Sequence, residues 1–158
     1  MKKTMMIMLL LCAALFLIAC GAGKATGSSA AQNSGQPEDG QNPVMNFIGV
    51  YESEDISILV EAKGNEDAKL TVTRETGENE KNEWIMSGNL DTETLRVEYH
   101  DCVKTDLLLG EDGTVVSEAE VYFNGHGFFF FDYENNSLTW QDDQEHIADG
   151  LTFVYSAP

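Results

Sequence analysis

The fold is decided by stretches such as Val115-Val116-Ser117-Glu118-Ala119-Glu120-Val121-Tyr122-Phe123, in which two sets of side chains alternate. The odd positions hold Val115, Ser117, Ala119, Val121 and Phe123, and the even positions hold Val116, Glu118, Glu120 and Tyr122. Successive side chains of a β-strand point to opposite faces, so a period of two is typical of a half-buried strand. The preceding Glu111-Asp112-Gly113 is a hairpin-turn signal.

Strand signals of this kind recur along the rest of the chain. They lie at residues 47–51, 56–61, 70–73, 84–86, 94–99, 103–109, 128–131, 138–140 and 151–155. We expect Ser87-Gly88-Asn89 and Asn124-Gly125-His126-Gly127 to be turns that end strands. No segment has a helical period. The pattern predicts an all-β, antiparallel up-and-down meander that forms a β-barrel of about 8–10 strands, with a β-sandwich as the alternative.

The N-terminal segment has the features of an export signal. Lys2 and Lys3 precede an uncharged apolar run over residues 5–18, and Ala19 and Cys20 follow. This order resembles the signal of bacterial lipoproteins, with Leu17-Ile18-Ala19-Cys20 as the lipobox. The resemblance implies cleavage between Ala19 and Cys20 and a diacylglycerol on the Cys20 sulfur. The apolar run is shorter than the roughly 20 residues that a spanning helix needs, so we expect residues 1–19 to be a signal peptide.

The next segment, residues 20–44, is rich in Gly, Ala, Ser, Gln and Asn and has no aromatic residue. Such a composition cannot bury enough apolar surface to fold, and it predicts a flexible tether with a reach of about 25–30 Å. The β domain should therefore occupy residues 45–158. The lipoprotein resemblance therefore implies a protein on the extracytoplasmic face of a bacterial cell membrane, held there by a lipid anchor.

Charge narrows the choice of partners. Without residues 1–19 the chain has seven basic and 27 acidic residues, a net charge of −20. A surface of this sign repels nucleic acid phosphates and anionic headgroups, so we expect no nucleic acid partner. It attracts cationic proteins, and it also keeps an exported domain soluble.

The start of the domain, Phe47-Ile48-Gly49-Val50-Tyr51, resembles the first strand of calycin-like barrels such as lipocalins, avidins and fatty-acid-binding proteins. In these proteins a Gly-x-Trp motif places an aromatic ring across the closed end of the barrel. Tyr51 would take that position here. The domain is also similar to small uncharacterised lipoproteins of gut clostridia, through this motif and the later Phe123-Asn124-Gly125-His126-Gly127. That second resemblance implies no activity.

Cys102 is the only cysteine after Cys20, which rules out a disulfide within the domain. His100 and Asp101 precede it and suggest a nucleophile with a base. On a regular strand His100 and Cys102 would share one face, too far apart for a tight hydrogen bond, while Asp101 would point to the other face. A catalytic cysteine also needs a lowered pKa and partial exposure. We favour a buried structural Cys102 over a catalytic one.

An acidic cluster, Asp142, Asp143, Glu145, His146 and Asp149, could coordinate Ca²⁺. It lacks the alternating ligand spacing and central glycine of a Ca²⁺ loop, and such clusters are expected at this charge. His126 stands between two glycines and reads as a turn residue. We therefore expect no metal site and no cofactor.

The run Phe128-Phe129-Phe130-Phe131 is unusual, because a strand with one buried face must direct two of these rings outward. Both rings could lie under a loop, or they could belong to a ligand or partner surface. The candidate aromatic residues for such a surface are Tyr51, Trp84, Tyr122, Phe128, Phe130 and Trp140.

These observations favour a tethered binding module for a small apolar ligand or a protein partner, and not an enzyme. An alternative is an inhibitor of a basic extracellular enzyme such as lysozyme, for which Ser87-Gly88 is the only candidate serine-glycine loop. A Cys102-dependent enzyme is the third hypothesis.

Overall fold

The computed structural model describes residues 42–156. The proposed signal peptide, Ala19, Cys20 and most of the tether lie outside the described residues. The elements in chain order are η1 (Pro43–Asn46), β1 (Gly49–Ser53), β2 (Ile56–Lys63), β3 (Asp67–Gly77), β4 (Glu80–Asp91), β5 (Arg96–Leu109), β6 (Val115–Asp132), β7 (Ser137–Asp142) and β8 (Phe153–Ser156).

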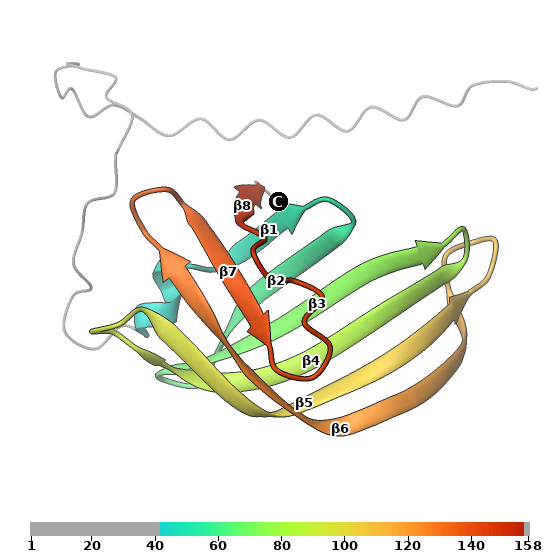
Figure 1. The fold of residues 1–158 in the computed structure, drawn as a ribbon, viewed down its shortest axis with the longest axis horizontal. Coiled ribbons are helices and arrows are strands. Elements are labelled where there is room, and N and C mark those ends of the chain that lie inside the picture. Colours follow the sequence, from blue (N-terminus) through green and yellow to red (C-terminus); the bar gives the residue numbers. More distant parts are fainter. Residues whose placement is uncertain (1–41, 157–158) are drawn as a thin grey trace, which may run out of the picture. The chain divides into compact units, whose positions relative to one another are not determined.

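The eight strands form one closed antiparallel barrel in sequence order (Figure 1). Each strand pairs with the next along the chain, and β1 pairs with β8 through Val50 with Ser156, Tyr51 with Tyr155, and Glu52 with Val154. The all-β, up-and-down barrel expected from the alternating pattern is confirmed, with a strand number inside the expected range.

Two of the expected turns are wrong. Ser87-Gly88-Asn89 lies within β4, and Asn124-Gly125-His126-Gly127 lies within β6. In both places glycine permits close contact between strands. A Cβ on Gly88 would overlap the Glu98 carbonyl oxygen, and one on Gly127 would overlap the Gln141 carbonyl oxygen. The glycines therefore mark close strand approach and not chain reversal.

Consequently the segments expected as separate strands at residues 115–123 and 128–131 are one long strand, β6. Residues 94–99 and 103–109 likewise belong to β5, except for the two residues before Arg96. The register between β5 and β6 shifts at several places along this pair. Each shift inserts a bulge, which bends the strands and increases their twist.

The barrel interior is filled by alternating apolar side chains. Val60, Leu70 and Met86 form one cross-strand row, since Val60 pairs with Leu70 and Leu70 with Met86. All three side chains are buried. Each such side chain contributes about 1.5–3 kcal/mol of transfer free energy. Burial of these rows is the main stabilising contribution to the closed ring of eight strands, which we call the ring.

One end of the interior is covered by η1 and Phe47. The Phe47 and Phe131 ring centroids are 4.5 Å apart, and the buried Tyr51 hydroxyl donates to the Phe47 carbonyl oxygen at 3.0 Å. Burial, with a smaller contribution from Tyr155, raises the pKa of Tyr51 to about 12. Tyr51 is thus a neutral core residue that ties η1 to the first strand.

Replacing Gly127 by alanine should destabilise the barrel by about 1–3 kcal/mol, the usual cost of overpacking. The added methyl group would meet the Gln141 backbone and the Tyr99 hydroxyl. Urea denaturation measures the change. Gly77→Ala is the matched control, because its Cβ would make only ordinary contact with the flexible Glu80 side chain. Equal denaturation midpoints for the two variants would contradict the close-approach explanation.

Candidate functional site

Two tryptophans lie at the end of the interior opposite η1. Trp84 and Trp140 pack edge to face at 5.7 Å between centroids. Trp84 Nε1 donates to the Tyr122 hydroxyl at 3.0 Å, and Trp140 Nε1 donates to the Tyr99 hydroxyl at 2.9 Å. Burial raises the pKa of both tyrosines well above the ordinary value. Both indole N–H groups are thus paired within the protein, and this cluster completes the core.

Beside Trp84, an ion pair fastens the loop between β7 and β8. Lys104 Nζ lies 2.6 Å from a Glu145 carboxylate oxygen and 5.1 Å from the centroid of the Trp84 ring. The Lys104 side chain is only 11% exposed. Asp142 is buried and accepts hydrogen bonds from the backbone N–H groups of Gln144 and Glu145. The loop is therefore held across this end of the barrel by two carboxylates.

Beyond Trp84 and Lys104 the longer strands continue past the ring. Arg74 is the last β3 residue that pairs with β2, and β7 pairs with β6 only from Gly127 onward. The projecting part consists of residues 75–83 and 105–120, which we call the arm; Figure 1 shows its two hairpins extending side by side. The arm is a four-stranded sheet with one face continuous with the barrel interior.

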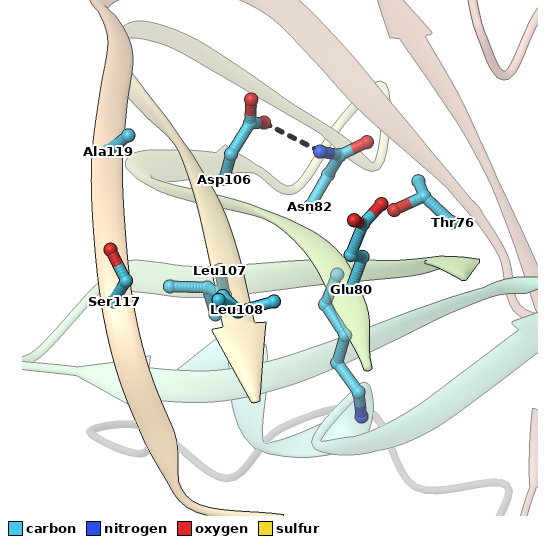
Figure 2. Close-up of a pocket in the computed structure, with 9 residues that line it drawn as sticks. Thr76, Glu80, Asn82, Asp106, Leu107, Leu108, Ser117 and Ala119 are labelled. Carbon is cyan, nitrogen blue, oxygen red and sulfur yellow. Dashed lines mark hydrogen bonds between the residues drawn. The ribbon is translucent and has the colours of Figure 1, made fainter. Parts of the chain in front are cut away.

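That face of the arm forms an open hollow of about 380 Å³, lined by both polar and apolar side chains. Trp84 pairs with Lys104 inside the barrel, and two residues further out Asn82 pairs with Asp106. Figure 2 shows the hydrogen bond from Asn82 Nδ2 to Asp106 Oδ1, which is 2.6 Å long. The lining residues are Thr76, Glu80, Lys81, Asn82, Asp106, Leu107, Leu108, Ser117 and Ala119.

The arm combines negative charge with exposed apolar side chains. Its two segments contain nine carboxylates and one lysine, Lys81, which pairs with Glu75 at 3.1 Å. Val116 is 60% exposed, and Phe123, just beyond the arm on β6, is 67% exposed. Leu108 and Val115 are also exposed. Acidic and apolar groups side by side suit a partner that is both cationic and partly apolar.

The six aromatic candidates separate into three groups. Tyr51, Trp84 and Trp140 are buried in the core. Tyr122 is half-buried at the boundary between ring and arm. Phe128 and Phe130 point outward, as expected for alternate residues of the phenylalanine run, and the Arg96 guanidinium lies 3.9 Å above the Phe128 ring. The structure therefore does not bring the six rings together on one surface.

Cys102 is buried, as favoured from the sequence. The expectation that His100 shares its face is wrong, since His100 is exposed and lies near Glu98. The register shift between Tyr99 and Cys102 reverses the alternation there. Burial, and then the charges of Asp142, Asp101 and Glu145, raise the pKa of the Cys102 thiol to about 12. The thiol is protonated at neutral pH, unlike the thiolate that acts as a nucleophile.

The side chains of the acidic cluster after β7 have different partners and do not converge on one point. Asp142 caps the loop, Glu145 pairs with Lys104, and His146 pairs with Asp149. Within residues 42–156, no group of three or more His, Cys, Asp or Glu side chains is arranged to hold a metal ion. His126 is a β6 residue 3.9 Å from Asp143, and not a turn residue.

Ser87-Gly88 is not a loop either. Both residues lie in β4, where the Ser87 hydroxyl donates to Asp101 and accepts from Lys63. Sequence reasoning did not identify Lys104, which lies where the closed barrel meets the arm, or Asn82 and Asp106, which line the hollow. Lys104 and Glu145 are 41 residues apart, and neither stands in a motif.

Comparisons with known proteins do not identify the chain: no family model, curated protein or solved structure matches it. Within residues 42–156, no helix is long and apolar enough to cross a membrane.

Breaking the Lys104–Glu145 pair should destabilise the domain, because the remaining charge would stay largely buried. We expect Lys104→Met and Glu145→Gln each to lower the free energy of unfolding by about 1.5–3 kcal/mol, and the double variant to lose less than the sum. Denaturant titration of the four proteins gives the coupling energy. Lys69→Met, which breaks an exposed pair with Glu61, is the control and should cost at most about 1 kcal/mol. Equal losses for Lys104→Met and Lys69→Met would contradict the fastening role.

Proposed function

We propose that this protein is a lipid-anchored, extracytoplasmic binding module of a bacterial cell membrane that holds a cationic protein partner on its arm. The anchor would be Cys20, on the strength of its lipobox resemblance. Residues 20–44 would space the domain from the bilayer.

The observation that carries the proposal is the composition of the arm, with nine carboxylates against one lysine beside exposed apolar side chains. Charge complementarity raises the association rate with a partner of opposite sign and suppresses partners of like sign. The exposed Leu108, Val115 and Val116 supply apolar area that charge alone does not. A partner with both features would gain affinity from each.

The interior offers less to a small apolar ligand. Trp84 is 1% exposed, and Val60, Leu70, Val72, Val97 and Phe129 have no solvent-accessible surface. A ligand cavity lined by these side chains would give them accessible surface. A barrel filled in this way favours a partner outside it over a ligand within it.

Inhibition of a basic enzyme such as lysozyme is one specific form of this proposal. The charge of the arm supports it, whereas Ser87-Gly88 does not, because it lies in a strand. The third hypothesis, an enzyme that uses Cys102, lacks support from the burial and raised pKa of the thiol.

Charge reversal on the arm tests the proposal with egg-white lysozyme as the cationic probe. Glu78→Lys/Glu111→Lys places two lysines near the hairpin tips of the arm. Glu93→Lys/Glu134→Lys makes the same change in net charge in turns at the opposite ends of the same strands. We expect the arm variant to weaken binding about tenfold more than the control, or about 1.4 kcal/mol, in calorimetric titrations at low salt.

Equal weakening by both variants would mean that total charge, and not the arm, attracts the probe. Absence of any binding by the unsubstituted protein to lysozyme and to a second basic protein, cytochrome c, would contradict the proposal. Lysozyme activity with the protein in large excess separates inhibition from binding alone.

A further inference from the structure

The arm has two edge strands, β3 and β6, and the longer open edge belongs to β6. β6 is 18 residues long, but β7 covers it only from Gly127 to Asp132. At His126 the carbonyl oxygen accepts a hydrogen bond from Asp143. From residue 115 to residue 125, β5 pairs with one side of β6, and within residues 42–156 no strand pairs with the other.

An open edge of this kind presents unpaired backbone groups. In an antiparallel ladder, alternate residues direct their N–H and C=O groups away from the paired strand. Proteins usually protect such edges with lysine, proline or bulges. Residues 115–125 contain neither lysine nor proline. Bulges do interrupt the register on both sides of residues 117–120, but these four pair regularly with Leu108, Leu107, Asp106 and Thr105.

The side chains of this regular segment have a definite chemistry on each face. Ser117 and Ala119 line the hollow, as Figure 2 shows, and are small. Glu118 and Glu120 alternate with them and so lie on the other face, and both are exposed. A strand added here would therefore meet two carboxylates on one face and small side chains on the other.

The charge of Glu118 and Glu120 decides which kind of strand could pair with this edge of β6. A second copy of this chain would bring Glu118 and Glu120 against the same residues of its own β6, and like charges placed across a ladder are destabilising. A strand with lysine or arginine at every second residue would instead pair each cation with a carboxylate. The two carboxylates therefore oppose pairing of this edge with a second copy of the chain, and they favour pairing with a basic strand.

We propose that residues 117–120 of β6 receive an extended basic segment of the partner as an added antiparallel strand. Backbone hydrogen bonds would supply affinity, and Glu118 and Glu120 would select lysine or arginine at alternate positions. This inference rests on the proposed function and adds to it the mode of binding and the sequence pattern of the partner.

Two synthetic peptides test the mode of binding. The first is acetyl-Lys-Val-Lys-Val-Lys-Val-Lys-amide, and the second is the same peptide N-methylated at every residue. Both carry the same charge and side chains, but the second has no backbone N–H to donate. We expect the first to bind the full chain at least tenfold more tightly, and to slow amide hydrogen exchange at residues 115–121 but not at residues 75–83.

Matched substitutions locate the contact. Glu118→Gln/Glu120→Gln should weaken the first peptide at least tenfold, whereas Glu78→Gln/Glu83→Gln, which removes the same charge from the neighbouring hairpin, should weaken it less than threefold. Equal affinity for the two peptides, or protection at residues 75–83 in place of 115–121, would overturn strand addition. Dimerisation of the chain with protection of residues 117–120 in the absence of peptide would overturn it as well. The lysozyme titrations of the arm variants are independent of these peptide experiments, because lysozyme binding depends on the charge of the arm and not on backbone pairing.

Discussion

The height of the ring is set by its shortest strands, and the rest of the molecule depends on this constraint. β1, β7 and β8 have four to six residues each, whereas β4, β5 and β6 have 12, 14 and 18. A sheet can close only where every strand is present, so closure between β1 and β8 involves three residue pairs. The remaining length of β3–β6 must project beyond the ring, and that projection is the arm.

The same sheet face changes character where closure ends. Inside the barrel most inward positions are apolar and buried, and the two tryptophan N–H groups donate to tyrosine hydroxyls. At Trp84 and Lys104 the inward row reaches the boundary, and the next inward pair, Asn82 and Asp106, is polar. The barrel interior is filled, and the surface that we propose for binding lies on the arm instead of in a central cavity. At this end, opposite η1, the Lys104–Glu145 ion pair holds the loop between β7 and β8 in place.

Sequence reasoning succeeded where local pattern determines structure and failed where distant contacts do. Period-two alternation correctly predicted an up-and-down barrel and the outward rings of Phe128 and Phe130. Clusters of Gly, Ser and Asn predicted turns at Gly88 and Gly127 that do not exist, because a glycine needed for close strand approach looks the same in sequence as one needed for a turn. His100 was assigned to the wrong face because a bulge has no sequence signature here. The roles proposed for Ala19 and Cys20 remain predictions.

The central claim is that a closed barrel with a filled interior carries a projecting arm whose β6 edge is open. Amide hydrogen exchange of the full chain in detergent, resolved by residue, tests it most directly. The account predicts that paired amides of β1 and β8 exchange as slowly as those of β2 and β3, while alternate amides of residues 117–120 exchange orders of magnitude faster. Rapid exchange across β8, or uniform protection of residues 117–120 at the level of the ring, would contradict it.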